Sequence, residues 1–145
     1  MSAEQLVPVV VDTSLVVKWL LPEPDSPSAL EQRRRWEADG VVPSAPDFLL
    51  LEVHNVLWKK LQRGEITASA PILLDAPTFG LHLNWFPFES LLPLAWGLAC
   101  RAHVSMYDAL YAALAQQLHA PFYTADTRLA ERLSPLLTVR TLVPA

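Results

Sequence analysis

The sequence of 145 residues contains one cysteine, few glycines and no long uncharged apolar run. Cys100 has no partner for a disulfide within the chain, which fits a reducing compartment. The most apolar uncharged stretch, Leu91–Cys100, is interrupted by Pro93 and is too short for a membrane-spanning helix. Met1–Val7 is short and contains Glu4, unlike the basic and apolar start of a signal peptide. We therefore expect a cytoplasmic protein with no membrane association.

Basic residues are also too few to form a general nucleic-acid coat. The chain has 11 Lys and Arg against 15 Asp and Glu, and its formal net charge is −4. It has no glycine-rich phosphate loop, which excludes nucleotide hydrolysis of the P-loop type. Apolar residues make up 52% of the chain, enough to bury a sizeable core. We find no repeat and no linker, so we predict a single domain over residues 1–145.

Short β-branched runs alternate with longer helical patterns along the chain. The predicted strands are Val7–Val11, Val41–Ala45, Leu81–Phe86, Pro121–Ala125 and Thr138–Leu142. The predicted helices are Leu15–Leu21, Ser26–Gly40 with Ser26 as its N-cap, Asp47–Arg63, Thr67–Ala76, Glu89–His103, Ser105–His119 and Thr127–Leu133. This alternation predicts an α/β fold with a central, mainly parallel sheet flanked by helices.

Two acidic residues follow directly after predicted strands. Asp12 comes after the apolar run Val7–Val11, and Asp126 comes after Pro121–Ala125. In open α/β sheets, ligands bind beyond the carboxyl ends of the strands, so both positions suit a functional site. Each residue could instead serve only as the N-cap of the helix that follows it.

Two further acidic residues lie in predicted helices. Glu52 follows four apolar residues, so we expect its turn to be largely buried, where a carboxylate needs a cation or a proton. The alternative is an ordinary surface glutamate. Asp108 stands three residues after Ser105, which is the spacing of a capping box, and the same first-turn position also lies near a pocket at the helix N-terminus.

The four acids together suggest a divalent cation site. Four carboxylates that meet at one sheet edge cannot all stay ionised without cations, because like charges raise each other's pKa. A ligand set made only of oxygen atoms suits Mg²⁺ or Mn²⁺. Two such ions about 4 Å apart can activate a water molecule and stabilise the leaving oxygen of a phosphodiester. We predict that Asp12, Glu52, Asp108 and Asp126 converge.

Four short segments in this order carry a family resemblance. They are Val11-Asp12-Thr13-Ser14 with Lys18-Trp19-Leu20-Leu21-Pro22-Glu23; Pro46 through Glu52 with Asn55-Val56-Leu57; Ser105-Met106-Tyr107-Asp108-Ala109-Leu110-Tyr111; and Thr124-Ala125-Asp126-Thr127-Arg128-Leu129. The whole chain resembles a PIN domain, and specifically the VapC-type toxin ribonucleases of bacterial and archaeal toxin–antitoxin pairs.

The resemblance implies both a fold and a set of site residues. It implies a PIN-like three-layer fold whose five-stranded sheet has the order 3-2-1-4-5. Its acidic cluster maps onto Asp12 and Asp108 as the first metal ligands, with Glu52 and Asp126 completing the site. It further implies three supporting residues, namely Ser14 and Thr124 as hydroxyl donors and Asn55 as a partner of the ligands.

The resemblance also implies an activity and partners. The chain would be a Mg²⁺- or Mn²⁺-dependent endoribonuclease, the toxin of a VapBC-type pair. It would act on RNA, be held by a cognate VapB-like antitoxin that inserts a peptide into the active-site groove, and form a homodimer.

One alternative is a non-catalytic, receiver-like signalling module that binds Mg²⁺. A haloacid-dehalogenase-like phosphatase is a third, but it needs a second Asp at position 14, where this chain has Ser14.

Overall fold

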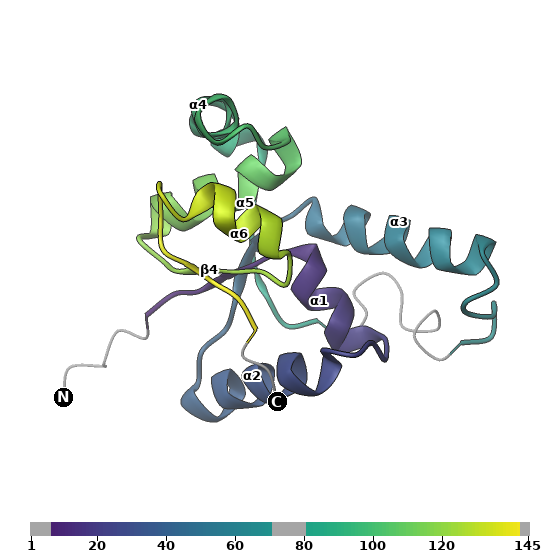
Figure 1. The fold of residues 1–145 in the computed structure, drawn as a ribbon. Coiled ribbons are helices and arrows are strands. Elements are labelled where there is room, and N and C mark those ends of the chain that lie inside the picture. Colours follow the sequence, from purple (N-terminus) through teal and green to yellow (C-terminus); the bar gives the residue numbers. More distant parts are fainter. Residues whose placement is uncertain (1–6, 71–80, 143–145) are drawn as a thin grey trace.

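The computed structural model describes residues 7–70 and 81–142, which form a five-stranded parallel sheet covered by helices (Figure 1). The strands are β1 (Val10–Val11), β2 (Ser44–Pro46), β3 (Asn84–Phe86), β4 (Phe122–Tyr123) and β5 (Val139–Arg140). Their order is β3-β2-β1-β4-β5, which confirms the implied topology. All four pairings are parallel, so the carboxyl ends of the strands meet at one edge. At the centre, β1 is fully buried, which explains why its sequence shows no polar alternation.

Helices cover both faces of this sheet. They are α1 (Thr13–Leu20), α2 (Ser26–Asp39), α3 (Leu49–Gln62), the 3-10 turn η2 (Glu89–Leu91), α4 (Leu92–Ala102), α5 (Met106–Leu118) and α6 (Thr127–Leu133). None of the helices within the described ranges is long and apolar enough to cross a membrane.

The two residues of β4 show how the layers are arranged. Successive side chains of a strand point to opposite faces, so Phe122 and Tyr123 each contact a different layer. The Phe122 ring stacks on Tyr111 of α5 at 6.1 Å between centroids, and the Tyr123 ring meets Trp36 of α2 edge-on at 4.9 Å. In Figure 1, α5 and α2 accordingly lie on opposite sides of the strands. The fold is the predicted three-layer α/β arrangement.

The second strand begins three residues later than predicted, because the preceding backbone groups are used elsewhere. Helix α2 ends at Gly40 as expected, with this glycine in the left-handed conformation at a φ of 71°. The next N–H, that of Val41, donates to Trp36 O at 2.8 Å and closes the helix end. Pro43 has no N–H to give to a ladder. Ser44 is therefore the first residue to pair, donating its N–H to Val9 O at 2.8 Å.

Three helix predictions need correction. Asp25, not Ser26, occupies the N-cap of α2, and the Ser26 hydroxyl binds the preceding loop instead. The predicted helix Glu89–His103 divides into η2 and α4, because Pro93 is tolerated only in the first turn of an α-helix. In the predicted helix Thr67–Ala76, residues 67–70 form a turn, and the part from residue 71 onward lies outside the described residues.

Candidate functional site

All four predicted acids line one pocket at the carboxyl ends of β1 and β4. The pocket has a cavity volume of about 390 Å³, and Asp12, Glu52, Asp108 and Asp126 lie in its wall. They come from the start of α1, the first turn of α3, the first turn of α5 and the start of α6. Because β1 and β4 are neighbours in the sheet, the residues that follow them meet at this edge. Chain topology therefore brings together acids that are far apart in the sequence.

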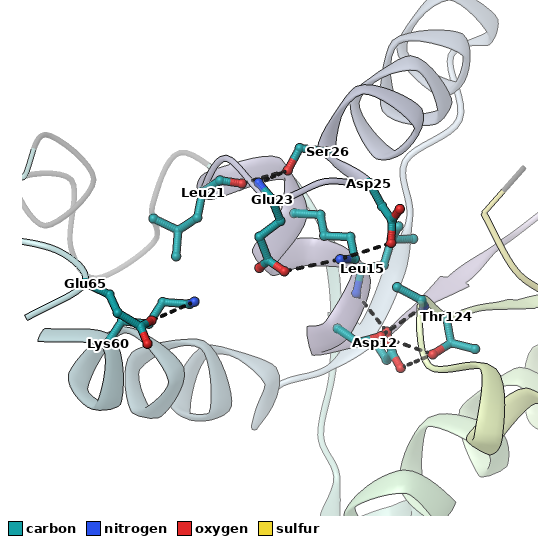
Figure 2. Close-up of polar contacts among 12 residues, drawn as sticks. Asp12, Leu15, Leu21, Glu23, Asp25, Ser26, Lys60, Glu65 and Thr124 are labelled. Carbon is teal, nitrogen blue, oxygen red and sulfur yellow. Dashed lines mark hydrogen bonds and ion pairs between the residues drawn. The ribbon is translucent and has the colours of Figure 1, made fainter. Parts of the chain in front are cut away.

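Asp12 is the most deeply buried of these acids, with 4% of its surface exposed. It is the N-cap of α1, and its Oδ1 accepts hydrogen bonds from Leu15 N at 3.1 Å and from Ser14 Oγ at 2.7 Å. Its Oδ2 accepts a hydrogen bond from Thr124 Oγ1 at 2.5 Å, a contact visible in Figure 2. The capping role and the pocket position thus belong to the same residue.

Burial dominates the electrostatics of Asp12. The pKa of its carboxyl is raised from 3.8 to about 6, mainly by loss of hydration and to a smaller extent by the charge of Asp108. The hydrogen bonds from Thr124, Ser14 and Leu15 act in the opposite direction. These donors are two hydroxyls and a backbone N–H, and no base of the described chain forms an ion pair with this carboxylate. A bound cation would supply the charge that its partners lack.

Ser14 and Thr124 join the two strand ends into one network. The Ser14 hydroxyl accepts a hydrogen bond from Ala125 N at 3.0 Å, while its proton goes to Asp12. The Thr124 hydroxyl accepts one from Asp126 N at 3.0 Å. Both predicted supporting hydroxyls therefore contact Asp12 and fix the backbone that leads to Asp126. That residue is exposed and caps α6 by accepting Leu129 N at 3.1 Å.

Asp108 stands in the first turn of α5, where Ser105 is the N-cap. The Ser105 hydroxyl accepts a hydrogen bond from Asp108 N at 3.1 Å, as the capping pattern predicts. Partial burial raises the pKa of the Asp108 carboxyl, and the charges of Glu52 and Asp126 add to this rise, whereas a hydrogen bond with Ser105 lowers it. The four carboxylates therefore interact with one another across the pocket.

Glu52 is half-buried and is held by two hydroxyls that sequence reasoning did not assign. Its Oε1 accepts hydrogen bonds from Tyr111 OH at 2.6 Å and from Thr13 Oγ1 at 2.9 Å. Burial and the negative charge of Glu52 raise the pKa of the Tyr111 hydroxyl well above its usual value, so it remains a donor. The sequence indicates these two residues only by their position next to predicted acids: Thr13 follows Asp12, and Tyr111 lies one helical turn after Asp108.

Asn55 is placed differently from the other predicted residues. It is exposed on α3, one turn after Glu52, and it is not among the described residues that line the pocket. The structure therefore does not bring Asn55 to the acids, and its supporting role stays a prediction.

The donor set fits a hard divalent cation. The described wall of the pocket carries five carboxylates, those of the four acids and Glu23, against one amine, that of Lys18. All candidate ligands are oxygen atoms, which suits Mg²⁺ or Mn²⁺ rather than a thiolate-binding metal. Within residues 7–70 and 81–142, no three acidic, histidine or cysteine side chains stand close enough to hold an ion as they are. An ion held by three of these carboxylates would therefore require side-chain rotation, which the exposed Asp126 and the partly exposed Asp108 permit.

The burial of Asp12 predicts a pH-dependent stability in metal-free protein. Its pKa is higher in the folded state than the usual 3.8, so protonation of this carboxyl stabilises the folded protein. This stabilisation is complete below pH 3.8 and is lost as the pH rises through about 6. We expect the free energy of unfolding to fall by about 2 kcal/mol between about pH 4.5 and about pH 7.5. Urea unfolding in the presence of a chelator measures this change. In Asp12→Asn the free energy of unfolding should fall less over this pH range. An equal fall in the wild-type protein and in Asp12→Asn would contradict the prediction.

Comparisons with known proteins support one family. Residues 9–133 match the PIN domain family. The chain is 31% identical over 132 residues to ribonuclease VapC3 of Pyrobaculum aerophilum, covering 90% of this chain and 98% of that relative.

Solved structures share the fold at lower sequence identity. VapBC2 from Rickettsia felis, bound to a DNA fragment from its promoter, gives a TM-score of 0.65 at 16% identity, covering 94% of this chain and 99% of that one. A toxin–antitoxin complex from Klebsiella pneumoniae gives a TM-score of 0.63 at 14% identity, with the same coverage of 94% and 99%. At such identities the likeness concerns the fold alone.

Proposed function

Because the chain belongs to the PIN domain family and is a relative of a ribonuclease VapC, we propose that it is a Mg²⁺- or Mn²⁺-dependent endoribonuclease, the toxin of a VapBC-type toxin–antitoxin pair. The observation that carries this proposal is the convergence of four carboxylates, from four separate helices, on one pocket at the carboxyl edge of the sheet. The strand order 3-2-1-4-5 also separates this fold from the receiver-like alternative, whose sheet has the order 2-1-3-4-5.

In this proposal Asp12 and Asp108 hold the metal, and Glu52 and Asp126 complete its environment. When bound, Mg²⁺ or Mn²⁺ supplies an activated water molecule and stabilises charge on the leaving oxygen. Hydrolysis would leave a 5′-phosphate and a 3′-hydroxyl. Thr13 and Tyr111 both donate to Oε1 of Glu52, which leaves Oε2 as the acceptor that orients or deprotonates the attacking water. Thr124 and Ser14 favour the ionised form of the Asp12 carboxyl, because their hydrogen bonds oppose the rise of its pKa on burial.

The partners follow from the same family relation. We propose RNA as the substrate, a VapB-like antitoxin as the binding partner, a homodimer as the assembly and the cytoplasm as the location. The toxin–antitoxin complex with the same fold supports the antitoxin. Exposed apolar side chains, namely Leu92 and Trp96 on α4 and Tyr107 on α5, provide surface suited to protein partners.

The proposal is tested by incubating purified protein with ribosomal and transfer RNA. We expect cleavage in Mg²⁺ or Mn²⁺, loss of cleavage in excess chelator and recovery when Mg²⁺ is restored. Product ends can be distinguished by whether they accept ligation, which requires a 5′-phosphate and a 3′-hydroxyl. Asp12→Asn, purified in parallel, controls for contaminating nucleases. Cleavage that the chelator does not affect would reject metal dependence, and phosphorylation by a small phosphodonor without nuclease activity would favour a signalling module.

A further inference from the structure

One base at the acidic pocket has no part in the chemistry described so far. Lys18 lies in the last turn of α1, and its side chain is only 12% exposed, so its stem is packed while its amine reaches the pocket. Lys18 is the only base among the described residues of the pocket wall. Ser14, which binds Asp12, stands four residues earlier on α1, or about 6 Å along the helix axis.

Two carboxylates hold the Lys18 amine in place. Its Nζ is 3.2 Å from Glu23 Oε2 and 3.5 Å from Asp25 Oδ2, and Figure 2 shows Glu23 and Asp25 reaching toward the same point. The loop that carries them is fixed separately by Ser26, whose hydroxyl accepts a hydrogen bond from Glu23 N at 2.8 Å and donates one to Leu21 O at 2.8 Å. These bonds fix the backbone of the loop at Glu23 without involving the Lys18 amine.

The amine keeps capacity for a further acceptor. A lysine ammonium has three N–H donors. One donates to Glu23 Oε2, and the ion pair with Asp25 takes at most one more. Both ion pairs are also longer than the 2.7–2.9 Å typical of a tight charge-assisted hydrogen bond. An anion that enters the pocket can thus receive the third N–H while Glu23 and Asp25 keep the amine aimed.

We propose that Lys18 binds a phosphate of the RNA next to the one that is cleaved, and so positions the strand over the four carboxylates. This inference rests on the proposed ribonuclease function. The phosphate at the acids has the metal to offset its charge, but the neighbouring phosphate enters a wall with five carboxylates and needs a separate cation. Lys18 lies one helical turn after Ser14, which binds Asp12, so both residues lie on the face of α1 that lines the pocket.

Binding and kinetics of Lys18→Gln test this proposal. Binding is followed by the anisotropy of a 5′-fluorescein-labelled, mixed-sequence single-stranded RNA, with both variants in the Asp12→Asn background to prevent cleavage. We expect Lys18→Gln to raise the Kd about tenfold and to reduce the slope of log Kd against log salt concentration by about 0.7, the value for one lost phosphate contact on a single strand. In the otherwise wild-type protein, KM should rise more than kcat falls, and Lys18→Arg should restore most of the affinity.

Two controls separate a phosphate contact from loss of charge or of an ion pair. Lys60 pairs with Glu65 at 3.2 Å, the same distance as Lys18 with Glu23, but it does not line the described pocket. Lys60→Gln therefore removes the same net charge and a similar ion pair, and it should leave the Kd within about twofold. Glu23→Gln breaks the Lys18 pair from the acid side, but Asp25 still contacts the amine and the pocket wall loses one negative charge, so the Kd should not rise. A purely structural pair would instead raise the Kd equally in Lys18→Gln and Glu23→Gln.

The outcomes distinguish this proposal from the ribonuclease function itself. If the wild-type protein cleaves RNA and Lys18→Gln matches Lys60→Gln in Kd, salt slope and KM, the role of Lys18 is wrong while the ribonuclease function stands. If the wild-type protein cleaves no RNA with Mg²⁺ or Mn²⁺, the ribonuclease function fails. Urea unfolding checks that each variant is folded. We expect the free energy of unfolding of Lys18→Gln and Glu23→Gln to change by at most about 1 kcal/mol, because these ion pairs are partly exposed.

Discussion

Replacing Asp12 with Asn is expected to abolish RNA cleavage, lowering the rate by about 1,000-fold or more, while the protein remains folded. Asp12 accepts hydrogen bonds from the hydroxyls of Ser14 and Thr124, and it is the most deeply buried of the four acids. An amide at this position keeps the volume of the carboxylate but loses the charge that attracts a divalent cation. Single-turnover cleavage of an RNA that the wild-type protein cuts measures the effect.

The same substitution should make metal-free protein more stable at neutral pH. The pKa of Asp12 is raised to about 6 by burial, so keeping this group ionised above that pH costs folding free energy. Asn avoids this cost, and its Nδ2 can donate to Thr124 Oγ1 if that hydroxyl turns. We expect a gain of about 2 kcal/mol in the free energy of unfolding. Asp39→Asn, at the exposed end of α2, is the matched control and should change neither cleavage nor stability appreciably. A strongly destabilised Asp12→Asn would contradict this view of the buried carboxylate.

Thr124→Val is expected to lower both stability and activity. Thr124 is 1% exposed, and its hydroxyl donates to Asp12 Oδ2 and accepts from Asp126 N. Valine keeps the shape but leaves a buried carboxylate oxygen and a backbone N–H without this partner, which should cost about 3 kcal/mol. The hydrogen bond from Thr124 also lowers the pKa of Asp12, so its loss should shift the pH–rate profile to higher pH. We expect cleavage at neutral pH to fall about 100-fold.

Thr124→Ser provides the control for this prediction. Serine keeps the hydroxyl and removes only a methyl group, so it should retain activity within a few-fold and lose about 1 kcal/mol of stability. If Thr124→Val instead cleaves RNA as fast as Thr124→Ser with an unchanged pH profile, the hydroxyl does not support Asp12.

Local sequence patterns predicted much of the fold because the responsible forces are local. The apolar run before Asp12 and the cap at Asp126 are readable from neighbouring residues, and α6 has the predicted bounds Thr127–Leu133. Strand ends were less predictable. The second strand depends on Val41 giving its N–H to the end of α2, and that bond could not be inferred from β-propensity.

The candidate site was predictable in its acids and, through the family resemblance, in the hydroxyls of Ser14 and Thr124 that bind Asp12, but not in the residues that bind Glu52. Asp12 and Asp126 stand at strand ends, where position in the sequence fixes position in the sheet. Glu52 is different, because its partner Tyr111 lies 59 residues away, and their contact depends on how α3 and α5 pack. Lys18 was likewise part of a recognised segment, but only the folded loop shows that Glu23 holds its amine at the pocket.

Titration of Mn²⁺ into metal-free protein, followed by electron paramagnetic resonance of the free ion, tests most directly whether the four carboxylates form one cation site. We expect saturable binding by the wild-type protein near neutral pH, at least tenfold weaker binding by Asp12→Asn and by Asp108→Asn, and wild-type binding by Asp39→Asn. Wild-type affinity in both pocket variants would show that these acids do not bind the ion together, and the proposed metal-dependent cleavage would lose its basis.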